Sequence, residues 1–159
     1  MITFYFAYGS NLNWEQMKER CPSASFYCRA SLSNYRIDFT RKSSERNCGV
    51  ADIVRDENNT VYGVVYRIDE IDLGKLDKHE GYVPQRDNNA YKRIEIMVFE
   101  DDNKEEPIIA FTYEVVKKEF RKYKPNKDYK NLIMTGAKYW KLPEDYINFL
   151  ENIETMEDE

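Results

Sequence analysis

The chain has 159 residues, the usual size of one domain, and a domain of that length buries roughly two thirds of its unfolded surface. Hydrophobic residues make up 42% of the sequence and charged residues 33%, and 13 Tyr and 8 Phe supply aromatic core material. This composition is typical of a soluble globular protein. The net charge of −5 argues against nucleic acid or an anionic membrane as the main partner.

The N-terminal residues 1–8 lack a basic segment and are too few for a signal peptide or a membrane span, so a cytoplasmic location is expected. Cys21, Cys28 and Cys48 are odd in number and have no paired spacing, which favours structural thiols over disulfides or a zinc site. His79 is the only histidine, so Ser-His, Cys-His and multi-histidine metal mechanisms depend on it or are excluded. We expect neither a metal nor a cofactor.

The first half of the chain is predicted to consist mainly of strands. Short runs rich in β-branched and aromatic residues predict strands at residues 2–8, 25–40 (as two strands), 49–54 and 61–68. Residues 13–20 can form a short helix, and the polar run Asp56–Asn59 predicts a turn between two of the strands.

The hydrophobic period changes after Asp69, which is a good helix N-cap. Leu73, Leu76 and Glu80 then lie on one helical face, and Gly81 is a natural stop. This pattern predicts a helix whose last turn carries Glu80.

The rest of the chain is predicted to add strands at 91–99 and 108–116, separated by an acidic turn at 100–106, and helices at about 128–139 and from 144 through 150. Six or seven strands with inserted helices predict an α+β fold with a mixed β-sheet curled into a small barrel. Periodicity alone does not determine whether the barrel closes. Without a linker or repeat, we expect a single domain over 1–159, with a frayed acidic tail at about 153–159.

The first candidate for a binding site is the turn Tyr8-Gly9-Ser10-Asn11-Leu12, between a strand and a helix. Glycine gives the backbone freedom, and successive backbone N–H groups at a helix start can bind an anion such as a carboxylate or an oxyanion. An ordinary strand-to-helix turn, capped by Asn11 or Asn13, is the alternative interpretation.

The second candidate is Glu80. Its helical phase points it inward and its position places it at the negative end of the helix dipole. Both effects raise the pKa of a carboxyl group and make its carboxylate a better base. The alternative is a solvated glutamate at a helix end, and His79 is expected to face solvent.

A basic stretch with interleaved aromatic residues, Lys117 to Lys124, is the third feature. Such a stretch can form a nucleic-acid surface. An exposed connector between the last strand and a helix explains it equally well, and the negative net charge favours the connector.

Four segments, in the right order, give the sequence a resemblance to the γ-glutamylcyclotransferase family, which includes AIG2-like and γ-glutamylamine cyclotransferase-like proteins. They are Phe6–Leu12, Gly49–Val54 with Val61–Tyr66, Leu76–Tyr82, and Pro125–Tyr146. The sequence departs from the family at Trp140-Lys141, where a small residue or glycine is common before Leu-Pro. That departure affects a pocket wall or a helix joint and not the chemistry.

The resemblance implies a compact barrel whose cavity binds a small-molecule γ-glutamyl substrate and releases 5-oxoproline, in a monomer or homodimer. Glu80 would carry the proton transfers, and the backbone of Gly9, Ser10 and Asn11 would bind either the oxyanion or the substrate α-carboxylate. Tyr8 and Leu12 would line the cavity and Tyr129 would close it.

The identity of the leaving amine stays open. So do two alternatives to this activity: a non-catalytic module that binds a γ-glutamyl-type ligand, and a different acyl transfer in the same site.

Overall fold

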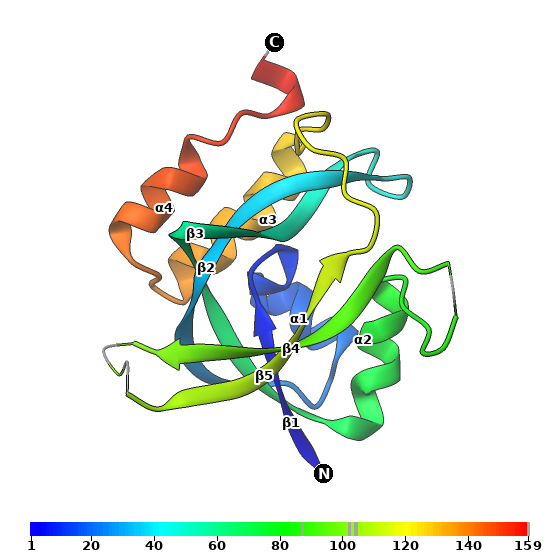
Figure 1. The fold of residues 1–159 in the computed structure, drawn as a ribbon, viewed down its shortest axis with the longest axis vertical. Coiled ribbons are helices and arrows are strands. Elements are labelled where there is room, and N and C mark those ends of the chain that lie inside the picture. Colours follow the sequence, from blue (N-terminus) through cyan, green and yellow to red (C-terminus); the bar gives the residue numbers. More distant parts are fainter. Residues whose placement is uncertain (87, 102, 104, 159) are drawn as a thin grey trace.

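The computed structural model describes residues 1–86, 88–101, 103 and 105–158. In this part of the chain, five strands form a closed barrel in the order β1-β3-β2-β4-β5 (Figure 1). They are β1 (Ile2–Ala7), β2 (Ser25–Ser43), β3 (Cys48–Asp69), β4 (Tyr91–Glu100) and β5 (Pro107–Val115). Tyr5 of β1 pairs in parallel with Phe111 of β5, and the other pairings are antiparallel. The expected mixed barrel is confirmed.

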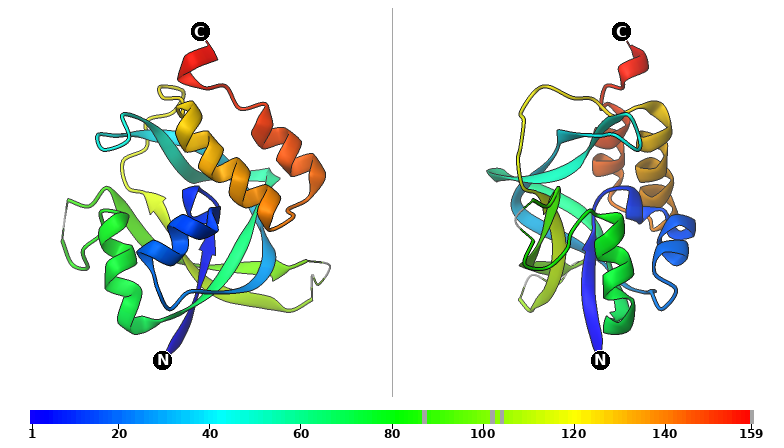
Figure 2. Two further views of the ribbon diagram at one scale, coloured as in Figure 1. Left: turned by 180° about the vertical axis from the view of Figure 1, so that it is seen from behind. Right: turned by 90° about the vertical axis from the view of Figure 1, so that its right-hand side faces the viewer.

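The helices gather on one side of the barrel, as the two views in Figure 2 show. They are α1 (Trp14–Arg20), α2 (Leu73–His79), α3 (Lys127–Tyr139) and α4 (Glu144–Glu151), with short 3-10 turns η1 (Ser10–Leu12), η2 (Glu70–Asp72) and η3 (Met156–Asp158). None of the helices within the described ranges combines the length and the hydrophobicity needed to cross a bilayer.

The strand count differs from the prediction because β2 and β3 are long and continuous. Residues 25–40 were expected to form two strands. Asp56–Asn59 was expected to form a turn between the strands predicted at 49–54 and 61–68. Instead β2 pairs with β3 along its length, and residues 56–59 lie opposite the single residue Asn34, between the pairs Ser33↔Thr60 and Tyr35↔Arg55. This bulge takes up the polar residues without ending either strand, because a β-bulge adds unpaired residues while the ladder continues on both sides.

The other predicted elements are confirmed with small shifts of their ends. The predicted acidic turn at 100–106 includes residues 102 and 104, which lie outside the described residues. At the other end of the chain, the segment expected to fray is held in place up to residue 158. The Met156 N–H donates to the Pro125 carbonyl at 3.0 Å, and Thr155 is buried with its hydroxyl 3.0 Å from the Asp158 carboxylate.

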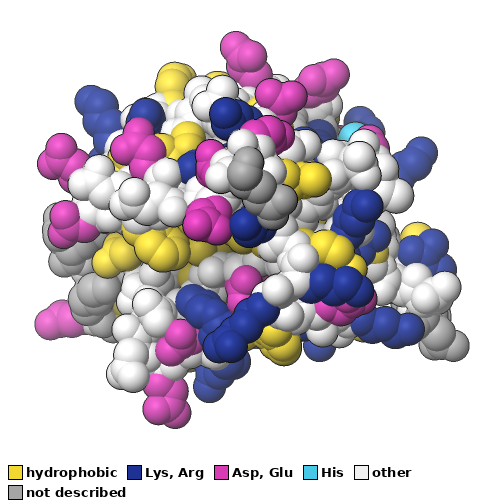
Figure 3. Space-filling view, turned by 90° about the horizontal axis from the view of Figure 1, so that it is seen from above, with side chains coloured by type: hydrophobic (Ala, Val, Ile, Leu, Met, Phe, Trp, Pro, Cys, Tyr) yellow, Lys and Arg dark blue, Asp and Glu magenta, His cyan; other side chains and the backbone are white. Residues whose placement is uncertain are grey.

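The basic stretch is tied into the barrel by Lys118. Its ammonium donates to the fully buried carboxylate of Asp52 at 2.6 Å, and that carboxylate also accepts from the Thr40 hydroxyl and the Val115 N–H. A buried carboxylate needs such partners because its desolvation is otherwise uncompensated. Lys and Arg side chains elsewhere are interspersed with Asp and Glu on the face seen in Figure 3. These observations support the connector interpretation of the stretch.

Helix α3 lies directly against η1 at Gly136. A Cβ atom at Gly136 would approach the Leu12 carbonyl carbon to 2.2 Å and the Asn13 nitrogen to 2.6 Å. One turn later, the indole N–H of Trp140 donates to the Leu12 carbonyl at 3.0 Å. Glycine at this position therefore lets the helix backbone touch the loop that follows β1, and Trp140 ties the two together.

We predict that Gly136→Ala lowers the free energy of unfolding by about 1 to 3 kcal/mol or more, because the added methyl group overlaps backbone atoms that cannot rotate away. Gly74→Ala in α2 is the matched control, since nothing lies within 4 Å of a Cβ at that exposed helical position. The control should be neutral or more stable by up to about 1 kcal/mol. Urea unfolding of both variants measures the difference, and equal stabilities would contradict the proposed contact.

Candidate functional site

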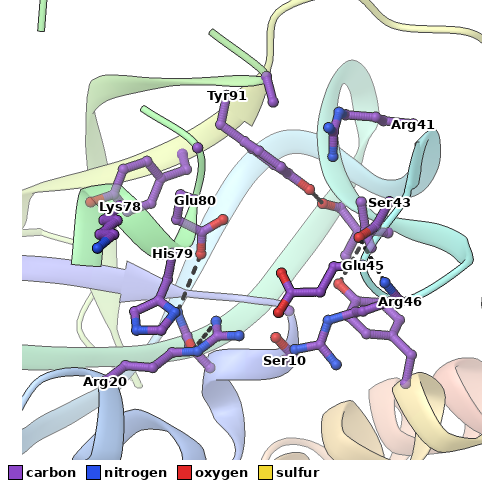
Figure 4. A pocket seen from close by; sticks show the side chains of 18 of the residues that line it. Ser10, Arg20, Arg41, Ser43, Glu45, Arg46, Lys78, His79, Glu80 and Tyr91 are labelled. Carbon is purple, nitrogen blue, oxygen red and sulfur yellow. Dashed lines mark hydrogen bonds between the residues drawn. The ribbon is translucent and has the colours of Figure 1, made fainter. Parts of the chain in front are cut away.

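A cavity of about 220 Å³ opens where the loop after β1, the end of α2 and the β2–β3 hairpin meet. Six of the seven residues expected from the sequence line it: Tyr8, Gly9, Ser10, Asn11, Glu80 and Tyr129. Figure 4 shows Glu80, His79 and Arg20 on one side of the cavity, and Glu45 and Arg46 of the hairpin on the other. Segments far apart in the sequence thus meet at one place.

Leu12 is the exception. Its side chain is fully buried in the core and is not part of the cavity lining, contrary to expectation. The reason is the 3-10 geometry of η1, in which Ser10 and Asn11 reach the cavity while Leu12 turns towards the core. Leu12 acts through its backbone carbonyl, which accepts from Trp140.

The loop presents backbone N–H groups at the start of η1. In the described residues, the amides of Ser10 and Asn11 have no hydrogen-bond acceptor, as is usual for the first residues of a helix. The absence of a side chain at Gly9 allows close packing here, because a Cβ atom added to this residue would lie 3.3 Å from Ala51 Cβ and 3.6 Å from the Tyr129 hydroxyl. Two free donors at the cavity wall can bind an anionic oxygen.

Glu80 is the C-cap of α2 and projects into the cavity. Its backbone N–H donates to the carbonyls of Leu76 and Asp77, and Gly81 follows with φ +64°, which ends the helix as predicted. Asn11 Nδ2 lies 3.3 Å from Glu80 Oε1 and 3.0 Å from the Tyr5 hydroxyl. The side chain of Asn11 therefore connects the glutamate to the floor of the cavity.

The pKa of the Glu80 carboxyl is raised from 4.5 to about 7. Burial is the main cause, and the charge of Asp77 adds to it. Arg20, Arg46 and Arg41 oppose the shift, in that order. A carboxyl group with a pKa near 7 can both accept and return a proton at neutral pH, as general acid–base catalysis requires.

The tyrosines around Glu80 stay neutral. Burial raises the pKa of Tyr129 to about 12 and places those of Tyr5, Tyr8 and Tyr91 well above 10.0. The hydroxyls are fixed by backbone groups: Tyr8 donates to the Tyr113 carbonyl at 2.6 Å and Tyr91 to that of Ala51 at 3.1 Å, while Tyr129 accepts from the Ala51 N–H at 2.9 Å. They form a rigid, uncharged wall.

Sequence reasoning missed a polar network that joins the two sides of the cavity. Gln16 Nε2 donates to Ser10 Oγ at 2.8 Å and to Asn11 Oδ1 at 2.9 Å, and its Oε1 accepts from Arg46 at 3.0 Å. Arg20 also donates to Asn11 Oδ1 at 3.2 Å. The sequence held one signal for this network, the i, i+4 spacing that places Gln16 and Arg20 on the same face of the helix after the loop. No sequence pattern indicated Arg46.

His79 is exposed, as predicted, and lies at the rim of the cavity. Burial of part of the ring and the nearby Arg20 lower its pKa, so the imidazole is neutral at neutral pH. It contributes a polar edge at the opening and no charge.

Comparison with known proteins places this chain in a family. The sequence profile of the AIG2-like family matches residues 60–150. The γ-glutamylcyclotransferase of Mus musculus is 37% identical over 96% of this chain and 79% of its own length, and that of Homo sapiens is 34% identical over 94% and 78%.

The fold agrees. A solved γ-glutamyl cyclotransferase structure superimposes with a TM-score of 0.88 at 32% identity, over 98% of this chain and 89% of the other. The chain belongs to the γ-glutamylcyclotransferase family.

Proposed function

We propose that this protein is a cyclotransferase that cleaves γ-glutamyl amides to 5-oxoproline and a free amine, with Glu80 as the group that moves the protons. The observation that carries the proposal is a half-buried carboxyl group with a pKa of about 7, set in a cavity beside free backbone N–H donors. Family membership gives the reaction class, and the lining of the cavity supports the assignment of the residues.

The substrate supplies its own nucleophile. The α-amine of a γ-glutamyl group reaches its own γ-carbonyl, and closing a five-membered ring benefits from the high effective concentration of an intramolecular attack. Two obstacles remain: the α-amine is protonated at neutral pH, and the leaving nitrogen departs poorly without a proton. Glu80 takes the proton from the α-ammonium group and then delivers it to the leaving nitrogen, so one carboxylate serves both steps.

The amides of Ser10 and Asn11 bind one of the two anionic groups that a γ-glutamyl substrate presents, the oxyanion formed at the γ-carbon or the α-carboxylate. Fixed N–H donors stabilise charge that develops in the transition state because they need no reorganisation when it appears. Gly9 and the Tyr8 hydroxyl hold this segment in place, and the Tyr129 ring closes the cavity beside Gly9.

We predict that Glu80→Gln lowers kcat by about a hundredfold to ten-thousandfold while the protein stays folded, since Gln is nearly isosteric but cannot carry a proton. Because the pKa of Glu80 is raised in the folded state, its contribution to stability is lost as the pH rises from about 4.5 to about 7, so the variant should be at least as stable as wild type at pH 8. The control is Glu95→Gln, at an exposed position on β4. A variant retaining more than about a tenth of the wild-type rate would show that another group is the base.

We further predict an acidic limb in kcat/KM centred near pH 7. Glu80 acts as a carboxylate, and with a pKa of about 7 its ionised fraction falls from about nine tenths at pH 8 to about one tenth at pH 6. Activity should therefore decrease as the pH is lowered. A profile flat down to pH 5 would contradict the assignment, and the residual activity of Glu80→Gln should lack this limb.

A third prediction concerns the substrate. Acetylating the α-amine of a γ-glutamyl amide, or shortening the side chain to β-aspartyl, should abolish product formation, because neither analogue closes the five-membered ring. A panel of γ-glutamyl amino acids, γ-glutamyl amines and glutathione, scored for 5-oxoproline, provides the positive control. Turnover of the acetylated substrate would point to hydrolysis by water, and no 5-oxoproline from any panel member would support a binding module.

A further inference from the structure

Asp77 is a buried carboxylate that the proposed reaction does not use. Its side chain is only 5% exposed, and it lies on α2 three residues before Glu80, which caps that helix. Residues at this spacing are neighbours on one helical face, with Cβ atoms about 5 to 6 Å apart. In the described part of the chain, Asp77 does not line the cavity. It is therefore placed to act on Glu80 and not on a substrate.

Two side chains of the barrel hold the Asp77 carboxylate. The Tyr113 hydroxyl of β5 donates to Asp77 Oδ1 at 2.5 Å, and Nε of Arg93 on β4 lies 3.8 Å from the same oxygen. Burial and this hydrogen bond raise the pKa of Tyr113, so the phenol keeps the proton that it donates. A buried carboxylate needs partners of this kind because its desolvation is otherwise uncompensated. The charge of Asp77 is thus fixed in place.

The same residue fixes the end of α2 that carries Glu80. The backbone N–H groups of Glu80 and Tyr82 donate to the Asp77 carbonyl at 3.1 and 2.9 Å. Tyr113 in turn accepts the Tyr8 hydroxyl on its own carbonyl at 2.6 Å. Asp77 therefore connects the helix end to β5 and, through β5, to the loop with the free N–H donors. A group that transfers protons must be held within reach of the reacting atoms, and such contacts provide that support.

Asp77 also supplies negative charge in surroundings that are mostly positive. The pKa of Glu80 is raised above all by burial, lowered by Arg20 and Arg46, and raised again by the charge of Asp77. Five tyrosines line the cavity and are neutral: Tyr5, Tyr8, Tyr91, Tyr113 and Tyr129. The other titratable or charged side chains of the wall come from α1, α2 and the β2–β3 hairpin (Figure 4): Arg20, Arg41, Glu45, Arg46, Lys78 and His79.

Most of these wall residues are cations. Glu45 is the acidic side chain among them, and because it is exposed its charge is screened by solvent. Asp77 is screened much less, since it is buried. It therefore opposes the arginines from the protein side of Glu80.

We propose that Asp77 is a positioning residue for Glu80: through Tyr113 it holds the end of α2 against β5, and its fixed negative charge keeps the proton on Glu80 between the two transfer steps. The inference rests on the proposed function. Arg93 moderates the effect, because its guanidinium partly neutralises the charge of Asp77. Removing the charge of Asp77 and removing that of Arg93 should thus change Glu80 in opposite directions, whereas a purely structural contact would respond alike to the loss of either partner.

The test compares the acidic limb of kcat/KM for γ-L-glutamyl-L-alanine. Asp77→Asn keeps an oxygen that accepts from Tyr113 but removes the charge, so the limb should move to lower pH. The ratio of kcat/KM at pH 6 to that at pH 8 should rise at least about twofold. Arg93→Gln, at a partly exposed position, should lower this ratio by a smaller factor. Glu57→Gln and Arg67→Gln remove the same charges at exposed positions of β3 and should leave the limb in place.

A second measurement follows Glu80 without turnover. In protein carrying 13C-labelled glutamate side-chain carboxyls, the signal missing from Glu80→Gln belongs to Glu80. Its titration midpoint should be lower in Asp77→Asn and higher in Arg93→Gln than in wild type. Because this signal reports the carboxyl group itself, it separates Glu80 from His79 and the other titrating groups of the wall.

Other outcomes overturn the inference. Unchanged midpoints, or shifts of the same sign in both variants, would show that the contact serves the fold alone, and so would a loss of kcat/KM in Asp77→Asn that is equal at pH 6 and pH 8. If a melting curve showed Asp77→Asn to be unfolded, Arg93→Gln would decide, and the absence of a shift there would overturn the proposal. If wild type released no 5-oxoproline, the proposed function itself would fail, while the titration would still decide the role of Asp77.

Discussion

The site depends on one close contact, the approach of the α3 backbone to η1 at Gly136. A side chain at this position would overlap the Leu12 carbonyl, and the Trp140 indole binds the same carbonyl from the next turn. The loop that carries Ser10 and Asn11 is thereby fixed between β1 and α3. Free backbone donors are useful to catalysis only when they are held still, and a helix at van der Waals distance holds them without using their hydrogen bonds.

The second constraint is electrostatic. Burial raises the pKa of Glu80, and the arginines oppose that rise, so the carboxyl group reaches about 7 and not a higher value. The guanidinium groups of Arg20 and Arg46 are also anchored to the loop, through Asn11 and Gln16. The charges that set the proton affinity of Glu80 are therefore connected to the residues that shape the cavity, and a change at Arg20 or Arg46 affects both.

The departure from the family pattern at Trp140-Lys141 has a structural explanation. Trp140 stacks on Phe26 with ring centres 4.4 Å apart and also binds η1, so it strengthens the joint between helix and loop. Lys141 has φ +58°, a left-handed conformation that glycine adopts at lower cost. The aromatic packing of Trp140 offsets this local strain.

The sequence by itself determined what depends on local patterns: the strand at residues 2–8, the helix ended by Gly81, the inward phase of Glu80 and, with the family motifs, the pairing of Glu80 with the Ser10–Asn11 loop. It did not determine the continuity of β2 and β3, because a bulge and a turn have the same polar residues, and only pairing with a long partner strand distinguishes them. It also missed Arg46, which lines the cavity from the β2–β3 hairpin and donates to Gln16 of α1, and placed Leu12 in the lining although η1 turns it into the core. These features depend on contacts between residues distant in sequence, which cannot be inferred from the spacing of neighbouring residues.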